Sequence, residues 1–247
     1  MANLAQELNA ALAARGLSDL AVTVLETVDS TNSECARLFR DGGAARRLVL
    51  AEGQTAGRGR VGRGFYSPPG SGLYLTLGLP LPARLEDAAD YTCFAAVAVS
   101  EEIERLCGLR CGIKWVNDLY LEGRKVCGIL TEAVGDHLIL GVGVNLAPSA
   151  VPEELRDIMG WLGRSEARVP LAAALAARVF AHRPGDRSHM EEYRRRCIVL
   201  GRTVEFVLNG VNHRGLAETV LDDGALKVNT PEGPVLLRSG EVSLRVT

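Results

Sequence analysis

The segment between two predicted strands limits which α/β folds this chain can adopt. The residues RLVLAEG (47–53) and SGLYLTLGLP (71–80) have the apolar and alternating patterns of strands. Between them, Gly57, Gly59 and Gly62 fit the spacing G-x-G-x-x-G. In a dinucleotide-binding fold a helix follows these glycines directly, because its N-terminus holds the pyrophosphate. Here SPPGSG and a second strand follow instead, so we exclude that fold for this segment.

Helical and strand patterns alternate through the first 198 residues, which we expect to form one domain. Ser30 and Thr31 are typical helix N-cap residues, and Glu34 follows Thr31 by three positions, as in a capping box. Turns are expected at Glu122-Gly123 and Gly135-Asp136. The predicted helices span 2–15, about 31–39, 87–107, 152–159, 168–182 and 189–197. The predicted strands span 21–28, 47–53, 71–80, 111–115, 118–123, 125–133 and 137–146.

The sequence changes character at Leu200. Five short strand patterns follow, separated by Gly, Asn and Asp turns, and no helical pattern interrupts them. They are GRTVEFVLNG, NHRGLAETV, DDGALKVNT, GPVLLRSG and EVSLRVT. This texture predicts a second domain at 199–247, a small all-β barrel.

Charge and composition exclude several classes of protein. The net charge of −2 argues against a broad nucleic-acid footprint, and no apolar run reaches the length of a membrane span. The N-terminal residues lack the basic start and unbroken apolar run of a signal peptide. None of the six cysteines forms a C-x-x-C motif. We therefore expect a cytoplasmic protein with reduced thiols and no structural metal, nucleic-acid partner or membrane partner.

Lysine is rare in this chain. Only Lys114, Lys125 and Lys227 occur among the 28 basic residues. A codon bias toward arginine explains the rarity without any function. Alternatively, Lys114 and Lys125, which lie close together in the sequence, occupy positions that need a compact ammonium in place of a planar guanidinium.

Residues 57–64, GRGRVGRG, form a loop that we call the arginine-glycine loop. Alternating glycines let the backbone approach a ligand closely, and Arg58, Arg60 and Arg63 offer guanidinium groups to carboxylate or phosphate. A surface loop solvated by its arginines is the simpler interpretation. The composition favours a ligand that is anionic at one end.

Five motifs in order carry a resemblance to a known family. DSTNSECA, EGQTAGRGRVGR, SPPGSGLYLTLGL, KWVNDLYLEGRKVCGIL and GVGVNL, between residues 28 and 146, together resemble the biotin protein ligases, also called biotin–[acetyl-CoA-carboxylase] ligases. The resemblance implies an α/β (α+β) fold, with a mixed sheet flanked by helices as in class II aminoacyl-tRNA synthetases. The β-rich tail resembles the small SH3-like C-terminal barrel of the family. The domain at 1–198 would then bind biotin and ATP.

The resemblance also implies site residues. The implied biotin-binding residues are Ser30, Thr31, Asn32, Gln54, Arg58, Gly59, Arg60 and Lys125. The residues implied for ATP and magnesium are Lys114, Asn117, Asp118 and Asn145. Among these, the implied catalytic residues are Arg58, Arg60, Lys125 and Lys114. Local alternatives stay open: Ser30-Thr31 as a helix cap, Asn117-Asp118 as a turn, and Gly141 and Gly143 as strand glycines under close packing.

The implied reaction joins biotin and Mg·ATP into biotinoyl-5′-AMP and then biotinylates a lysine of a carrier protein. The partner would be the biotin carboxyl carrier of acetyl-CoA carboxylase or a related carboxylase, and the enzyme a monomer or homodimer. Two alternatives remain: a lipoate or octanoate protein ligase, and a biotin-binding regulator without ligase activity. Only about 29 residues precede Ser30, so we expect no winged helix-turn-helix domain.

The chain departs from the family pattern at three places. Phe65 stands where the family commonly has tryptophan, and Val116 where it commonly has proline. No aromatic residue between 147 and 160 matches an adenine-stacking residue, which leaves Trp161 as the candidate.

Overall fold

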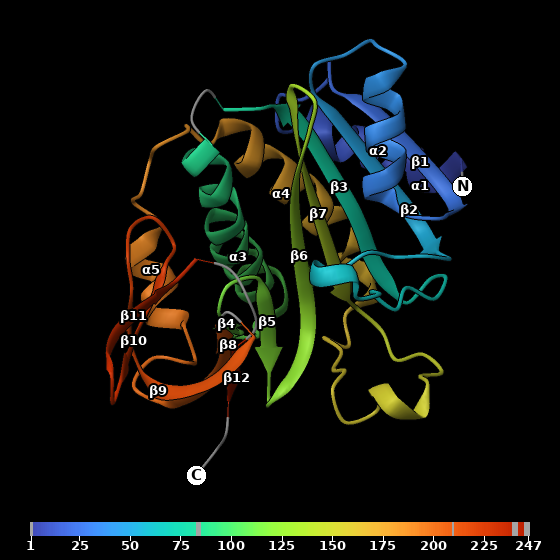
Figure 1. Ribbon diagram of the computed structural model, residues 1–247. Helices are drawn as coiled ribbons and strands as arrows, with labels where there is room; N and C mark the ends of the chain where they lie inside the picture. The colour runs from blue at the N-terminus through green and yellow to red at the C-terminus, as the bar shows by residue number, and fades with distance from the viewer. Residues whose placement is uncertain (1, 83–84, 209, 239–241, 245–247) are drawn as a thin grey trace.

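The computed structural model describes residues 2–82, 85–208, 210–238 and 242–244, and shows a large sheet beside a small one (Figure 1). The large sheet has seven strands in the order β1-β2-β3-β7-β6-β5-β4. Its strands are β1 (Ala21–Val28), β2 (Arg47–Gln54), β3 (Gly72–Pro80), β4 (Gly112–Lys114), β5 (Asp118–Leu121), β6 (Arg124–Val134) and β7 (His137–Asn145). The helices are α1 (Ala2–Ala13), α2 (Thr31–Arg40), α3 (Leu85–Cys107), α4 (Arg168–Ala181) and α5 (Met190–Arg196). The predicted mixed α/β architecture is confirmed.

The strand pairings are mixed, as predicted. β1 and β2 are parallel, whereas β2 and β3 run antiparallel on either side of the arginine-glycine loop. β3, β7, β6 and β5 continue the antiparallel order. The turn between β5 and β6 places Glu122 at φ 50° and Gly123 at φ 79°, the left-handed geometry that a two-residue hairpin turn needs. The two predicted turns are confirmed, and the strand β3 follows the glycines of the loop, as predicted.

Helices α1, α3 and α4 cover one face of the large sheet. α4 carries the run LAAALAA, and Ala172, Ala173 and Ala176 on it are buried. These small side chains let α4 pack closely against α1, α3 and β3. β3 is buried along nearly its whole length, so the residues that alternate with its leucines, Tyr74 and Thr76 among them, are buried as well.

Helix α2 covers only part of the opposite face. Its Cys35 packs against Val49 of β2 and Ile139 of β7 in a small apolar cluster. α2 does not cover the rest of this face, where polar and small residues take the place of apolar ones. Thr76 of β3 pairs with Gly141 of β7, and Gly141 pairs with Leu130 of β6. This uncovered part of the face is the floor of the cavity described below.

One predicted helix is wrong. Residues 152–159 form only a 3-10 turn, η2 (Glu153–Leu155). The chain then runs beside β6, where Lys125 N–H donates to the carbonyl of Ile158 at 2.8 Å and Gly160 N–H donates to the carbonyl of Lys125 at 2.8 Å. These strand-like bonds to a distant residue satisfy the backbone groups that a longer helix would have used. Helix α1 also ends two residues earlier than predicted, and α5 is one residue shorter at each end.

The C-terminal region forms a five-stranded antiparallel sheet in the order β11-β10-β9-β8-β12. Its strands are β8 (Thr203–Leu208), β9 (Val211–Val220), β10 (Leu226–Thr230), β11 (Gly233–Leu237) and β12 (Val242–Leu244). The predicted five strands are confirmed, although residues 241 and 245–247 of the last pattern lie outside the described residues. In the described part of the chain, no helix is long and apolar enough to cross a membrane.

The small sheet contacts the large domain through the turn between β9 and β10. Trp115 donates its indole N–H to the carbonyl of Gly224 in this turn at 2.9 Å. Arg194 of α5 donates to the carbonyl of Val220 at 2.6 Å and forms an ion pair with Asp222. The two sheets therefore meet beside the segment that follows β4.

Candidate active site

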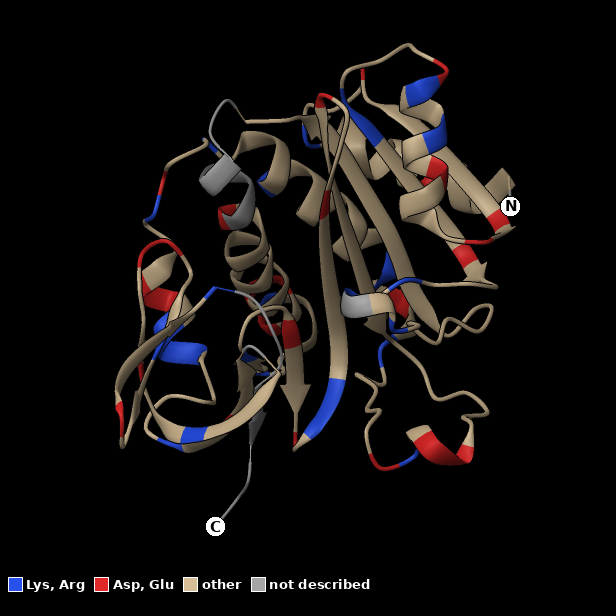
Figure 2. Cartoon of the chain, in the orientation of Figure 1, with Lys and Arg blue, Asp and Glu red and all other residues tan. Residues whose placement is uncertain are grey.

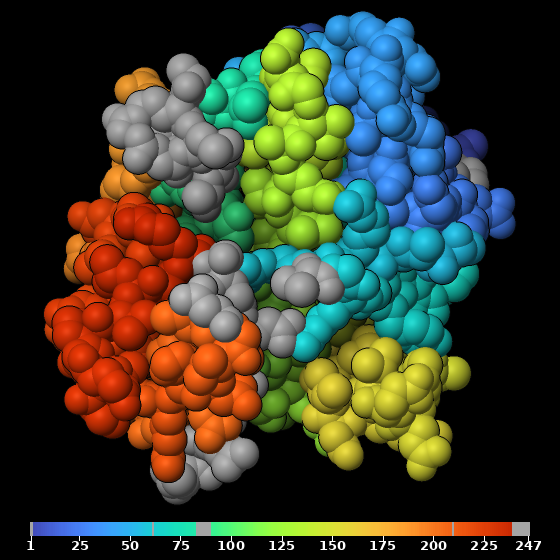
Figure 3. Space-filling model, viewed as in Figure 1, coloured from blue at the N-terminus to red at the C-terminus, as the bar shows by residue number. Residues whose placement is uncertain are grey.

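A cavity of about 240 Å³ lies between the uncovered face of the large sheet and the arginine-glycine loop. In the space-filling view, the loop, drawn in cyan, lies across the front of the molecule beside the lime-green strand β6 (Figure 3). Eleven of the twelve residues proposed from the sequence line this cavity: Ser30, Thr31, Asn32, Gln54, Arg58, Gly59, Arg60, Lys114, Asn117, Asp118 and Lys125. Motifs that are far apart in the sequence thus converge on one site.

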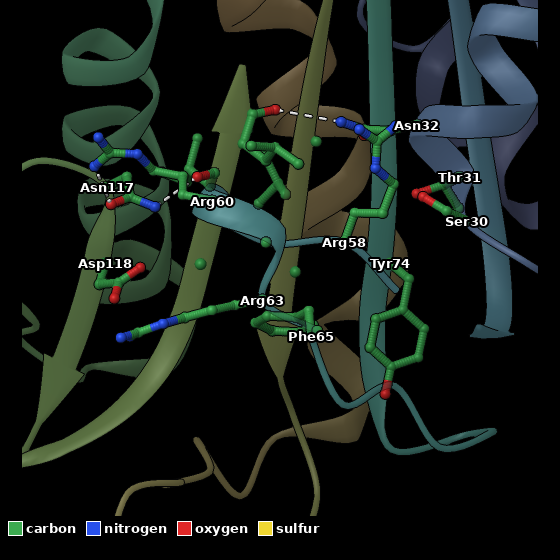
Figure 4. A pocket seen from close by; sticks show the side chains of 18 of the residues that line it. Ser30, Thr31, Asn32, Arg58, Arg60, Arg63, Phe65, Tyr74, Asn117 and Asp118 are labelled. Carbon is green, nitrogen blue, oxygen red and sulfur yellow. Dashed lines mark hydrogen bonds between the residues drawn. The ribbon is translucent and has the colours of Figure 1, made fainter. Parts of the chain in front are cut away.

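The cavity has a neutral polar side and a charged side. Figure 4 shows Ser30, Thr31 and Asn32 on one side and Asn117 and Asp118 on the other, with Phe65 between them; Arg58 extends toward Asn32, and Arg60 toward Asn117. Lys and Arg residues lie on the loop and at the start of β6 (Figure 2). This division suits a ligand with an uncharged polar head and an anionic tail.

Gln54 organises the neutral side. Its Oε1 accepts hydrogen bonds from the backbone N–H of Thr31 at 2.8 Å and from the Thr31 hydroxyl at 3.1 Å. Its Nε2 donates to the hydroxyl of Ser67 at 2.8 Å. Gln54 therefore satisfies one of the free N–H groups at the start of α2. Ser30 is the N-cap residue of α2, but its side chain makes no capping hydrogen bond. The predicted side-chain cap is therefore wrong at Ser30.

Asn32 lies on the cavity floor and is held by three elements. Its Nδ2 donates to Glu132 at 2.9 Å, and its Oδ1 accepts from the hydroxyl of Thr76 at 2.7 Å. A Cβ at Gly141 would lie 2.3 Å from Asn32 Oδ1. Gly141 is thus a strand glycine under close packing, as one alternative proposed, and it also lines the cavity.

Phe65 forms the apolar wall. A Cβ at Gly143 would lie 2.5 Å from the Phe65 ring, and one at Gly128 would lie 3.0 Å from it. The two glycines sit opposite each other on β7 and β6 and leave a shallow place for the ring. Phe65 therefore keeps an aromatic surface at the position where the family commonly has tryptophan.

Two arginines of the arginine-glycine loop contact residues of the sheet region. Arg58 forms an ion pair with Glu132 at 2.6 Å, and Arg60 donates to the Oδ1 of Asn117 at 3.2 Å. Asn117 in turn donates to the carbonyl of Ile129 on β6 at 2.8 Å. Both arginines line the cavity.

The charged side contains two of the three lysines. Lys125 Nζ lies 2.8 Å from Asp118 Oδ1 and 6.0 Å from the centre of the Phe65 ring. Lys114 Nζ lies 5.4 Å from the centre of the Tyr120 ring. Burial raises the pKa of Tyr120, and the nearby Asp118 charge adds to this, so Tyr120 stays neutral beside the ammonium group. The remaining lysine, Lys227, pairs with Glu218 in the small sheet.

Asn117 and Asp118 supply an amide oxygen and a carboxylate to the charged side. Oxygen ligands of this kind are those that magnesium prefers, and magnesium commonly takes its other ligands from phosphates and water. Among the described residues, no group of three or more His, Cys, Asp and Glu side chains could hold a metal on its own.

The structure does not bring Asn145 into the cavity lining. This buried side chain donates from Nδ2 to the carbonyls of Lys125 at 3.3 Å and Gly160 at 3.0 Å. Both carbonyls belong to the strand-like pairing that fixes the start of β6. Asn145 thus contacts the backbone of Lys125, and the ATP and magnesium contact that the sequence implied stays a prediction.

Trp161 does not line the cavity either, whereas Trp115 does. Trp115 belongs to the KWVND motif, and its position next to Lys114 could have indicated that it lines the cavity. Other lining residues that the sequence analysis left out of the site are Arg63, Gly64, Phe65, Tyr74, Leu75, Gly128, Ile129, Leu130, Gly141, Val142 and Gly143. Most of them belong to the floor strands, and no local pattern separates such residues from ordinary strand residues.

Comparisons with known proteins agree with this geometry. The model of the Biotin/lipoate A/B protein ligase family matches residues 24–145, and that of the Biotin protein ligase C terminal domain matches residues 199–245. The chain is 30% identical over 239 residues to the bifunctional ligase/repressor BirA of Bacillus subtilis (strain 168), covering 89% of this chain and 72% of BirA. It is 32% identical over 240 residues to the biotin–[acetyl-CoA-carboxylase] ligase of Paracoccus denitrificans, covering 89% and 98%.

A solved structure shows the same fold. The biotin protein ligase from Aquifex aeolicus in complex with biotin and ATP superimposes with a TM-score of 0.78 at 26% identity. The match covers 92% of this chain and 99% of that one. These two relatives, at 30% identity or more, and both family models show that the chain belongs to the biotin protein ligase family.

Proposed function

We propose that this protein activates biotin with ATP to biotinoyl-5′-AMP and transfers the biotinyl group to a lysine of a biotin carboxyl carrier protein. Membership of the ligase family supports this reaction. The single observation that carries the proposal is one cavity that joins two sides: hydroxyl and amide groups with Arg58 beside Asn32 on one side, and Arg60 with two lysines on the other.

The neutral side suits the ureido ring of biotin. That ring offers one carbonyl acceptor and two N–H donors, which need hydroxyl and amide partners in fixed directions. Ser30 and Thr31 supply hydroxyls, and Asn32 supplies an amide that its neighbours orient. We assign Ser30, Thr31, Asn32 and Gln54 to the ring and the aromatic wall of Phe65 to its apolar part.

The charged side suits the reacting groups. In the first step, a biotin carboxylate oxygen attacks the α-phosphorus of ATP, and the bond from that phosphorus to the bridging oxygen breaks to release pyrophosphate. Two anions must approach each other, so cationic side chains stabilise the transition state. We assign this role to Arg58, Arg60, Lys114 and Lys125, with the backbone of Gly59 close to the ligand.

Magnesium prefers oxygen ligands such as the Asp118 carboxylate and the Asn117 amide oxygen. We propose that these residues hold it together with the ATP phosphates. The ion would stabilise the negative charge on the phosphate oxygens. In the second step, the amine of the carrier lysine attacks the acyl carbon of the adenylate, loses a proton and expels AMP. The loop and Phe65 would exclude water, which otherwise hydrolyses the mixed anhydride.

A lipoate or octanoate ligase is the second candidate, since the matching family model includes lipoate ligases. The hydroxyl and amide groups around Gln54 favour a polar ring over a dithiolane or an alkyl chain. The test is mass spectrometry of a biotin carboxyl carrier domain and a lipoyl carrier domain, each incubated with enzyme, Mg·ATP and biotin or lipoate. A mass increase of the first carrier with biotin alone supports the proposal, and modification of only the lipoyl carrier contradicts it.

We further propose that residues 1–198 form the catalytic domain and residues 199–247 the small domain, as the separate family models suggest. All six cysteines are free thiols, which supports a cytoplasmic location. The net charge of −2 supports a function without nucleic acid. We further propose that the enzyme is a monomer or homodimer.

A further inference from the structure

Glu132 of β6 lies outside the cavity lining, yet it contacts two residues of the site. Its Oε2 accepts from the amide of Asn32 at 2.9 Å, and its Oε1 pairs with Arg58 at 2.6 Å. The three residues come from β6, from the first turn of α2 and from the arginine-glycine loop. Only 24% of the Glu132 side chain is exposed, so one carboxylate joins three separate segments.

The contact with Asn32 fixes the orientation of its amide. An ionised carboxylate only accepts hydrogen bonds, so Glu132 can receive only the NH₂ end of Asn32. The carbonyl of Leu130, 3.5 Å from the same Nδ2, also favours this orientation. The Oδ1 of Asn32 is therefore directed to Thr76 and Gly141 on the cavity floor. A flipped amide would lose the hydrogen bonds to both Glu132 and Thr76, so the orientation of Asn32 is fixed.

The contact with Arg58 holds the loop against the sheet. The Arg58 side chain is 48% exposed, and ion pairs with such exposure are weak because water screens them. The second attachment, Arg60 to Asn117, is a single hydrogen bond of 3.2 Å. Both of these contacts are ones that an incoming anion can replace.

We infer that Glu132 is a positioning residue for biotin: it orients Asn32 and holds the arginine-glycine loop closed before substrate binds. The first role sets the affinity for the ring, and the second decreases the disorder that binding must remove. This inference rests on the proposed function for its kinetic part, whereas its structural part concerns the ligand-free protein and does not depend on any reaction.

The test compares Glu132→Gln with Glu101→Gln. Glu101 of α3 forms an ion pair of the same 2.6 Å length and similar exposure with Arg178, away from the cavity. Gln keeps the size of Glu132, but it removes the ion pair and can present either end of its amide to Asn32. The first readout is limited trypsin digestion of the ligand-free protein, because Arg58, Arg60 and Arg63 are potential cleavage sites within the loop.

We expect Glu132→Gln to be cut within residues 57–64 at least about threefold faster than wild type, the scale of losing a half-exposed ion pair. Glu101→Gln should match wild type. Arg58→Gln, which breaks the same pair from the loop side, should accelerate cleavage at Arg60 and Arg63 similarly. Equal loop cleavage in Glu132→Gln and wild type would overturn the inference, and so would equal acceleration by Glu101→Gln. Thermal unfolding by circular dichroism checks that each variant is folded.

The second readout is steady-state kinetics. Loss of a hydrogen bond to a charged group predicts an increase of about fivefold to tenfold in KM for biotin, with kcat changed less than about twofold. A fall in kcat at unchanged KM would contradict a role in positioning biotin. If the protein transferred no biotin, the proposed function would fail, while the trypsin comparison would still decide whether Glu132 holds the loop.

Discussion

Lys125 and Asp118 form an ion pair of 2.8 Å at the edge of the cavity, although they lie on different strands. The pair holds the lysine ammonium on the charged side in the absence of substrate. Only about a quarter of each side chain is exposed, so the charges are poorly screened. An anion entering the cavity meets an ammonium group that is already in place.

Substitution of Lys125 by alanine should lower the rate of adenylate formation by about two to four orders of magnitude, because a transition-state charge partner is lost. A pyrophosphate-release assay with biotin and Mg·ATP measures this rate. Lys227→Ala is the matched control, since Lys227 also pairs with a carboxylate, that of Glu218, but lies in the small sheet. Near-normal turnover in Lys125→Ala would remove Lys125 from the reaction.

Substitution of Arg60 by glycine should release the adenylate from the cavity. The change removes the hydrogen bond to Asn117 that holds the loop on its charged side. Adenylate that escapes reacts with any exposed amine, so the variant should biotinylate a bystander protein that wild type leaves unmodified. Streptavidin blotting of a mixture containing serum albumin tests this. Retention of the intermediate equal to wild type would contradict a closing role for the loop.

Substitution of Asn145 by alanine separates its two possible roles. As a positioning residue, it donates hydrogen bonds to the carbonyls of Lys125 and Gly160. Loss of these hydrogen bonds should destabilise the protein by about 1–3 kcal/mol. Adenylate formation should fall at the same time because Lys125 is no longer fixed. Urea unfolding and the pyrophosphate assay measure the two effects. Lost activity with unchanged stability would favour a direct contact of Asn145 with magnesium or ATP.

Substitution of Gly141 by alanine should raise KM for biotin by about tenfold or more. The added methyl would lie 2.3 Å from Asn32 Oδ1, so Asn32 must move from its position, and misplacement of a binding group weakens recognition. Isothermal titration calorimetry with biotin measures the loss of affinity. Unchanged affinity would show that Asn32 does not contact the ring.

A buried charge cluster outside the site should make stability depend on acid pH. Asp90 of α3 lies 3.0 Å from His182 Nε2, 3.0 Å from His189 Nε2 and 2.6 Å from Arg187 Nη1. Burial alone would raise the pKa of Asp90, but hydrogen bonds from the two histidines and the Arg187 charge hold it below its ordinary value of 3.8. The stabilisation is therefore complete above that value and is lost as the pH falls below it.

The Asp90→Asn variant tests this cluster. At neutral pH it should be less stable than wild type by about 3–5 kcal/mol, because Arg187 loses its buried partner. Urea unfolding from about pH 5 to about pH 3 should show the difference decreasing toward the acid end. A difference that grows as the pH falls below 3.8 would contradict the lowered pKa.

The sequence was informative where a local pattern is enough. The alternation in β3 and the turn at Glu122-Gly123 were predicted because strand period and turn geometry depend on a few neighbouring residues. The scarcity of lysine proved to be a useful signal, since Lys114 and Lys125 line the same cavity. The short turn at Glu153–Leu155 was mispredicted as a helix because the bonds of Lys125 to Ile158 and Gly160 come from a distant strand.

By itself, the sequence determined the order of helices and strands, the loop that no helix follows, and eleven of the residues that line the cavity. Tertiary structure alone decided which of these residues touch one another. Gln54, and not the Ser30 side chain, accepts a hydrogen bond from the first turn of α2. Asn145 donates to the backbone carbonyl of Lys125, and Glu132 accepts from Asn32, which lies 100 positions away in the sequence. Local preferences act over one or two turns of chain, whereas these contacts depend on the sheet order and register that bring distant strands together.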